Sequence, residues 1–202
     1  MNETDAGDET TASASETLCT GVVTIASDRS LETDDSGAEI TSALEAGGHE
    51  ITVREHVVPD HDNVQSIVSR LIDRTDVDVV ITAGATGVEP TDITIEAVDP
   101  LLEKDLDTFS ELFTVLSHEQ VGTSALTTRT LAGITDGTLV FCLPGRADAV
   151  RLALEEIILS EAPELIELAR GDEPDVEVGQ GGEDSEDGDA NPTETDAADG
   201  GV

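Results

Sequence analysis

Short apolar runs alternate with amphipathic stretches along the middle of the chain. Runs rich in β-branched residues predict buried strands, and they occupy residues 18–27, 49–58, 77–83 and 138–143. The clearest helical spacing places apolar residues at i, i+3, i+4, i+7 and i+8, namely Val64, Ile67, Val68, Leu71 and Ile72. Further helices are predicted over residues 36–46, from about residue 93, over 109–116 and over 146–169. This alternation predicts an α/β fold with three layers, in which a mostly parallel sheet has helices on both faces.

Polar residues at the ends of these elements suggest caps and turns. Residues 36–39 (Ser-Gly-Ala-Glu) match a capping box for the first helix. Asp62 is a candidate cap for the second helix, and Asp92 for the third. Residues 136–137 (Asp-Gly) predict a turn. Residues 122–133 show no clear periodicity and therefore predict neither a helix nor a strand.

The candidate chemistry lies in loops that follow the predicted strands. Right-handed crossovers bring such loops to the carboxyl edge of a parallel sheet, where α/β folds bind ligands. The residues concerned are Ser27, Asp28, Asp60, Gly84, Ala85, Thr86, Gly87, Asp92, Pro144, Gly145 and Arg146, together with the hydroxyl and guanidinium pair Thr128 and Arg129. Each motif alone is weak evidence for a ligand site. Their expected position at one edge of the sheet makes a shared site a stronger prediction than any one motif does.

Each of these motifs has a plain structural explanation beside the functional one. The loop from Gly84 to Gly87 lets a phosphate approach the backbone, but a tight turn explains it as well. Asp60 and Asp92 could together hold Mg²⁺ with phosphate oxygens and water, or could cap loops and helices. Arg146 could bind an anion or pair with a surface acid.

The charge is extreme and extends over the whole chain. The formal net charge is −37, and residues 18–170 alone carry 29 acids and nine bases. Such self-repulsion destabilises a compact domain in dilute salt, whereas the Debye length falls to about 3 Å at 1 M salt. We therefore expect adaptation to a salty cytoplasm. The same charge disfavours binding to nucleic acid or to anionic membranes, which need a basic surface.

The two termini differ in composition from the middle of the chain. Residues 1–17 and 171–202 are acidic, contain no base and lack periodicity, so we expect a disordered arm and a disordered tail around one domain at 18–170. The N-terminus has neither the basic nor the apolar region of a signal peptide, and no apolar run approaches the roughly 18 residues that a membrane span needs. A cytoplasmic location is expected.

The cysteines and histidines suggest no further site. Cys19 and Cys142 lie in predicted strands and are expected to be free thiols rather than a disulfide. The four histidines lack metal-site spacing, and no Ser/His/Asp constellation is evident.

The ordered series of motifs resembles the molybdenum cofactor biosynthesis protein B family, of the MoaB/Mog type, over residues 18–169. The motifs are Ser27-Asp28-Arg29, Asp34-Asp35-Ser36-Gly37, Val58-Pro59-Asp60, Thr82-Ala83-Gly84-Ala85-Thr86-Gly87, Pro90-Thr91-Asp92-Ile93-Thr94 with Glu96-Ala97, Phe109-Ser110-Glu111-Leu112-Phe113, Gly122-Thr123-Ser124-Ala125, Thr128-Arg129 with Ala132-Gly133, and Gly137-Thr138-Leu139-Val140-Phe141 leading to Leu143-Pro144-Gly145. Each is modest alone, but the series is hard to obtain by chance.

The resemblance implies a pterin-binding α/β fold that assembles as a homotrimer or homohexamer. Active members of the family use Mg²⁺ and ATP to transfer AMP to the terminal phosphate of molybdopterin, releasing pyrophosphate. The resemblance assigns Asp60 and Asp92 to metal binding and catalysis. It assigns the loop from Gly84 to Gly87, the Thr128 hydroxyl and the turn at Pro144-Gly145 to binding of the pterin phosphate or nucleotide. A non-catalytic molybdopterin-binding or scaffolding member is the alternative.

Three positions depart from the family pattern. Ala85 replaces the second glycine of the loop, and its methyl group could crowd a ligand or change φ and ψ. Thr128 replaces a serine and keeps the hydroxyl, while Arg146-Ala147 replaces a small or polar pair. Ala85 bears most directly on catalytic competence.

Overall fold

The computed structural model describes residues 17–27 and 30–171. The predicted acidic arm and tail lie, apart from residues 17 and 171, outside this part of the chain. Within it, no helix is long and apolar enough to cross a membrane.

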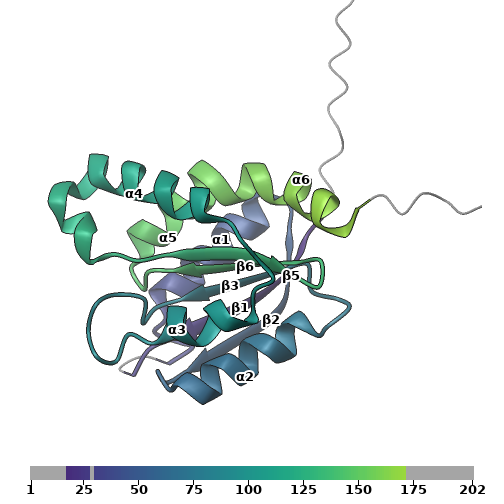
Figure 1. The fold of residues 1–202 in the computed structure, drawn as a ribbon, viewed down its shortest axis with the longest axis horizontal. Coiled ribbons are helices and arrows are strands. Elements are labelled where there is room, and N and C mark those ends of the chain that lie inside the picture. The colour runs from purple at the N-terminus through teal and green to yellow at the C-terminus, as the bar shows by residue number, and fades with distance from the viewer. Residues whose placement is uncertain (1–16, 28–29, 172–202) are drawn as a thin grey trace, which may run out of the picture. The chain divides into compact units, whose positions relative to one another are not determined.

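The described residues contain a six-stranded sheet flanked by helices (Figure 1). The strands are β1 (Cys19–Ile25), β2 (Glu50–Val57), β3 (Val79–Ala83), β4 (Lys104–Asp105), β5 (Leu131–Thr135) and β6 (Thr138–Leu143). The α-helices are α1 (Asp35–Ala46), α2 (His61–Ile72), α3 (Thr94–Val98), α4 (Asp107–Val121), α5 (Ala147–Ala153) and α6 (Leu159–Arg170). Short 3₁₀ segments follow α3 and α4, at η1 (Asp99–Leu101) and η2 (Gly122–Thr127), and a π-helical turn, η3 (Leu154–Ile158), joins α5 to α6.

The strand order is β2-β1-β3-β6-β5-β4. The first four strands in this order are parallel, whereas β5 runs antiparallel to β6 and β4 antiparallel to β5. The predicted three-layer, mostly parallel α/β fold is confirmed. The sequence pattern missed β4 and β5, although the predicted turn at residues 136–137 does connect β5 to β6, with Asp136 and Gly137 both at positive φ.

Alternate residues of the central strands enter two separate cores. On one face, β3 and β6 place Ile81 and Phe141 against α1, α4, α5, η3 and α6. On the other face, Val80 and Val140 pack against α2, α3 and η1. Figure 1 shows these two helix layers on opposite sides of the sheet. Because both faces are covered, the central strands are apolar throughout, as a parallel sheet requires.

Both cysteines are free thiols, as predicted. Cys142 is the penultimate residue of β6 and is fully buried, and this burial raises the pKa of its thiol to about 12.

The helix starts differ from the predicted ones. α1 begins at Asp35 and is capped by Asp34 rather than Ser36, and α2 begins at His61 and is capped by Asp60 rather than Asp62. α3 begins at Thr94 without a side-chain cap, so Asp92 is not a helix cap.

Candidate functional site

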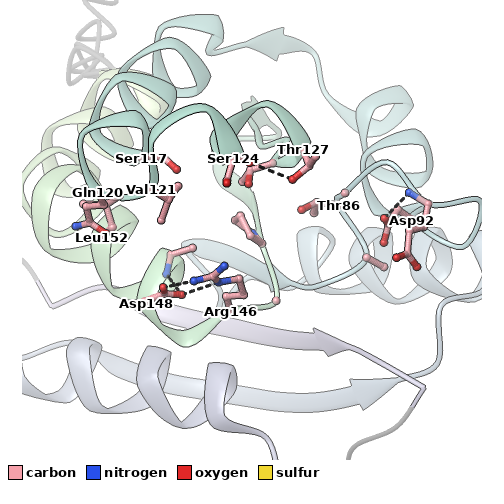
Figure 2. Close-up of a pocket in the computed structure, with 17 residues that line it drawn as sticks. Thr86, Asp92, Ser117, Gln120, Val121, Ser124, Thr127, Arg146, Asp148 and Leu152 are labelled. Atoms are coloured by element: carbon pink, nitrogen blue, oxygen red, sulfur yellow. Dashed lines mark hydrogen bonds and ion pairs between the residues drawn. The ribbon is translucent and has the colours of Figure 1, made fainter.

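A cavity of about 570 Å³ opens at the carboxyl edge of the parallel strands (Figure 2). Its volume is within the range of small-molecule sites. Three segments line it: the loop between β3 and α3, the end of α4 with η2 and the residue after it, and the turn between β6 and α5 together with one side of α5. The lining residues are Ala85, Thr86, Gly87, Glu89, Asp92, Ser117, Gln120, Val121, Ser124, Thr127, Thr128, Pro144, Gly145, Arg146, Asp148, Ala149 and Leu152.

The Gly-rich loop is held by the strands and helix beside it. Gly84 donates its N–H to the Leu143 carbonyl at 2.9 Å, and its own carbonyl accepts the buried Thr94 hydroxyl at 2.8 Å. Gly84 has φ +111°, and a β-carbon there would lie 2.2 Å from the Ile25 carbonyl oxygen. Only glycine satisfies both conditions. Ala85 lies next to it at φ +50°, a left-handed conformation that costs an alanine about 1–2 kcal/mol.

Asp92 lies against this loop rather than at a helix start. Its Oδ2 accepts the Glu89 N–H at 2.8 Å, and a β-carbon on Gly87 would come within 2.6 Å of the same oxygen. Within the described part of the chain, Oδ1 of Asp92 has no hydrogen-bond donor. Glu89 lines the cavity as well, so two carboxylates border it at this end.

Arg129 supports the loop from behind and does not line the cavity. Its Nε donates to the Thr86 and Gly87 carbonyls at 3.0 and 2.8 Å, and its Nη1 lies 2.6 Å from Glu96 Oε1. The hydrogen bond from Arg129 lowers the pKa of Glu96. The guanidinium predicted to bind substrate therefore engages the loop backbone and an acid.

The turn after β6 packs directly on the Gly-rich loop. A β-carbon on Gly145 would lie 3.0 Å from Gly84 Cα, so the two backbones touch. Arg146 points along this wall and pairs with Asp148, with Nε 3.0 Å from Oδ1 (Figure 2). The hydrogen bond from Arg146 lowers the pKa of Asp148. A phosphate at this wall would compete with Asp148 for the guanidinium.

Besides Arg129 and Gly84, two further predicted site residues, Asp60 and Ser27, lie outside the lining of this cavity. Asp60 does not line it, and its Oδ1 caps α2 by accepting the Asn63 N–H at 3.0 Å. Ser27 follows β1 at the expected edge but is exposed and also outside the lining. Asp28 falls outside the described residues. Of the proposed carboxylate pair, only Asp92 borders the cavity.

A smaller cavity of about 140 Å³ lies beside the loop, lined by Gly84, Ala85, Gly145, Thr24, Ile25, Ala26, Ser36 and Ala83. Next to it, the buried Asp34 carboxylate accepts hydrogen bonds from Thr24 (2.6 Å), Ser36 (3.0 Å), the Gly37 N–H (2.9 Å) and Arg54 (3.0 Å). Burial alone would raise the pKa of Asp34, but these bonds outweigh it and the pKa is lowered. Asp34 thus fixes the start of α1 to β1 and β2.

The sequence pattern did not single out the wall formed by α4 and α5. Ser117, Gln120 and Val121 are spaced i, i+3 and i+4, so they share one face of α4. Leu152 faces them from α5. Their spacing in the sequence indicates that they share one face of a helix. Nothing in the sequence indicates that this face lies beside the edge of the sheet.

The fold and this cavity define the class of protein: an α/β domain with a cavity bordered by strand-end loops. Residues 7–165 match the model of a probable molybdopterin binding domain. The chain is 42% identical, over 141 residues, to the molybdenum cofactor biosynthesis protein B of Bacillus cereus, and this match covers 69% of the chain and 83% of that protein.

Solved structures agree. A crystal structure of a molybdenum cofactor biosynthesis protein B superposes with a TM-score of 0.76 at 38% identity, covering 78% of this chain and 99% of that one. The tungsten cofactor synthesizing protein MoaB from Pyrococcus furiosus gives 0.69 at 34% identity, covering 77% and 99%. The chain belongs to the molybdenum cofactor biosynthesis protein B family, and the resemblance inferred from its motifs is confirmed.

Proposed function

We propose that the protein adenylylates molybdopterin, using ATP and Mg²⁺ and releasing pyrophosphate. One observation carries the proposal: a single cavity gathers the Gly-rich loop, the Asp92 carboxylate, the Thr128 hydroxyl and the turn at residues 144–145. These segments are far apart in the sequence. Membership of a family named for molybdenum cofactor biosynthesis supports the same substrate.

In this reaction a terminal phosphate oxygen of molybdopterin attacks the α-phosphorus of ATP. The new P–O bond forms as the bond to the β-phosphate oxygen breaks, and pyrophosphate leaves with that electron pair. Such a transfer depends mainly on positioning and on neutralising negative charge. The hydroxyls of Thr86 and Thr128 can donate to phosphate oxygens, and both line the cavity.

The residues present suit Mg²⁺. This ion is held by one or two carboxylates together with substrate phosphates and water. Asp92 has an oxygen without a donor in the described part of the chain, and Glu89 is the second carboxylate at the same end. No cluster of three or more acidic, histidine or cysteine ligands occurs among the described residues, so phosphate oxygens would complete the set. When bound, Mg²⁺ would neutralise charge on the phosphates.

The test is pyrophosphate release at high salt by wild type and two matched variants. Asp92→Asn should fold normally and lose at least about 100-fold in turnover, the typical cost of removing one electrostatic contact in a transition state. Asp60→Asn is the informative partner, because asparagine caps helices as well as aspartate does. If Asp60→Asn loses as much turnover as Asp92→Asn, Asp60 has the metal-binding role that the family resemblance assigns to it. Unchanged turnover in Asp92→Asn would refute the proposal.

The second candidate is a molybdopterin-binding member without turnover. It is favoured by Ala85, which adopts a strained left-handed conformation where the family pattern has glycine. Binding of molybdopterin without pyrophosphate release in wild type would establish this function and exclude the enzyme.

We also propose self-association as a homotrimer or homohexamer. Large apolar side chains are exposed on neighbouring parts of α4 and η2, including Leu112, Val115 and Leu126, and α6 exposes Leu168. Exposed apolar surface of this kind often marks protein contacts. Sedimentation equilibrium at high salt measures the state directly, and a monomer over the whole concentration range would contradict the proposal.

A further inference from the structure

All four backbone carbonyls of the Gly-rich loop, residues 84–87, are engaged in hydrogen bonds. The first two accept the hydroxyl and the N–H of Thr94, at 2.8 and 2.9 Å. The next two accept the Nε of Arg129, at 3.0 and 2.8 Å. The loop therefore cannot turn a carbonyl oxygen toward a ligand without breaking one of these bonds.

The N–H groups of the same stretch have the opposite status. In a trans peptide the C=O of one residue and the N–H of the next point in opposite directions, and the described residues contain no cis peptide. The N–H groups of residues 85–88 therefore point away from Thr94 and Arg129. None of them has a hydrogen-bond acceptor within residues 17–27 and 30–171. Successive N–H groups of this kind, in a turn with one residue in the left-handed region as Ala85 is, form a concave site for an anion.

Glu96 fixes the guanidinium that holds the second pair of carbonyls. Its Oε1 lies 2.6 Å from Nη1 of Arg129, and its Oε2 lies 3.3 Å from Nη2. Such a two-point pairing restrains the plane of the guanidinium. The side chains of Arg129 and Glu96 are 37% and 51% exposed, and ion pairs as exposed as this contribute little to stability. Orientation of Arg129 explains the pair better than stability of the fold does.

We infer that Arg129 is a positioning residue, which acts on a substrate phosphate by keeping the N–H groups of Gly87 and Val88 turned toward it, and that Glu96 fixes its orientation. The inference rests on the proposed function, which requires a phosphate at this loop. It replaces the direct contact with phosphate that the sequence predicts for Arg129. Thr86 and Gly87 line the cavity and Arg129 does not, so the guanidinium acts through the backbone between them.

Two variants of Arg129 separate its hydrogen bonds from its charge. The amide nitrogen of glutamine stands the same number of bonds from Cα as Nε of arginine does, so Arg129→Gln can keep the donor without the charge. Arg129→Met has a similar length and no donor. Arg74→Met is the control for net charge, because Arg74 forms an exposed ion pair with Asp76 and does not line the cavity.

The measurement is calorimetric titration with inorganic tripolyphosphate at high salt, at a temperature where urea unfolding shows each variant to be folded. Arg129→Met should weaken binding at least about 10-fold, the effect of one lost hydrogen bond to a charged group. Arg129→Gln should bind more tightly than Arg129→Met, and Arg74→Met should bind as the wild type does. Equal losses in the two Arg129 variants would show that the charge itself binds the anion and would overturn the inference. Absence of binding in the wild type would overturn it as well.

Glu96→Ala gives a test in which the two roles of Arg129 predict opposite results. If Arg129 positions the loop, release of its guanidinium should weaken tripolyphosphate binding. If Arg129 contacts the anion directly, the released guanidinium should leave binding unchanged or tighten it, and the positioning role is then wrong. This test also remains decisive if Arg129→Met fails to fold.

Pyrophosphate release separates this inference from the proposed function. If the wild type binds tripolyphosphate and the variants behave as expected, but no pyrophosphate is released, the proposed reaction fails and the positioning role of Arg129 stands. If the wild type and Arg129→Met release pyrophosphate at the same rate, the positioning role fails and the proposed function stands.

Discussion

Substitution of Gly84 by alanine tests the central contact of the site. The β-carbon would meet the Ile25 carbonyl oxygen at 2.2 Å, and a backbone carbonyl cannot rotate away as a side chain can. The positive φ costs about 1–2 kcal/mol and overpacking a further 1–3 kcal/mol, against which the less flexible unfolded chain returns about 0.4–1 kcal/mol. Gly84→Ala should therefore lower the free energy of unfolding by about 2–4 kcal/mol, a large part of a typical total of about 5–15 kcal/mol.

Gly48 provides the matched control. It also has a positive φ, +81°, but a β-carbon there meets nothing within 4 Å. Gly48→Ala thus carries the conformational cost without the clash and should lose about 1 kcal/mol or less. Urea unfolding at constant high salt, followed by circular dichroism, measures both. With an m value of about 2 kcal/mol/M, the midpoint should fall by about 1–2 M for Gly84→Ala and by about 0.5 M for Gly48→Ala. Equal midpoints would show that the loop moves away from Ile25 without cost.

Three further predictions concern the loop, pH and salt. Ala85→Gly should change the free energy of unfolding by less than about 1 kcal/mol. Relief of the strain of the left-handed conformation is offset by the greater backbone entropy of glycine in the unfolded chain and by the loss of a methyl group packed on the core. A loss above about 2 kcal/mol in urea unfolding would contradict this. Burial lowers the pKa of His49, whose Nδ1 accepts the Leu18 N–H. The contribution of His49 to the free energy of unfolding should therefore be fully present above its unfolded-state pKa of about 6.5. It should be lost as the pH falls through the lower folded-state pKa. His49→Asn should make the melting temperature depend less on pH in this range. An unchanged pH dependence would show that other groups cause it. Lowering KCl from about 1 M to 0.1 M lengthens the Debye length from about 3 to 10 Å and should lower the melting temperature, whereas a flat response would refute salt adaptation.

The layers and the edge that carries the site were predictable from sequence because they depend on local pattern. Continuous apolar strands and one amphipathic helix are sufficient to indicate a covered parallel sheet. β5 was missed because Gly133 argues against a strand. In the structure a β-carbon on Gly133 would meet Leu102 at 2.5 Å and the Lys104 carbonyl at 2.6 Å, so the glycine is needed where β4 and the residues before it pack against β5. This pairing joins residues about 30 apart in the sequence and leaves no local signal.

The helix caps show the same limit. Asp34 and Ser36 are both residue types that cap helices. Asp34 is the cap of α1 in the structure because Thr24 of β1 and Arg54 of β2 donate further hydrogen bonds to its carboxylate. Likewise, the candidate motifs predicted eight residues of the cavity lining, namely Ala85, Thr86, Gly87, Asp92, Thr128, Pro144, Gly145 and Arg146. Ser117 could not be found in this way, because its place in the cavity lining depends on where α4 lies relative to the sheet.

The two edges of the sheet also determine how the protein resists fibre-like association. An exposed edge strand can recruit a strand from another molecule unless its length or its charges prevent it. At one edge β4 is two charged residues long, Lys104 and Asp105. At the other, β2 carries Arg54 and Glu55, which are tied by ion pairs to Asp34 and Arg70. In concentrated salt, where repulsion between acidic chains is screened, a short edge and an edge with its charges already engaged keep the sheet from growing beyond six strands.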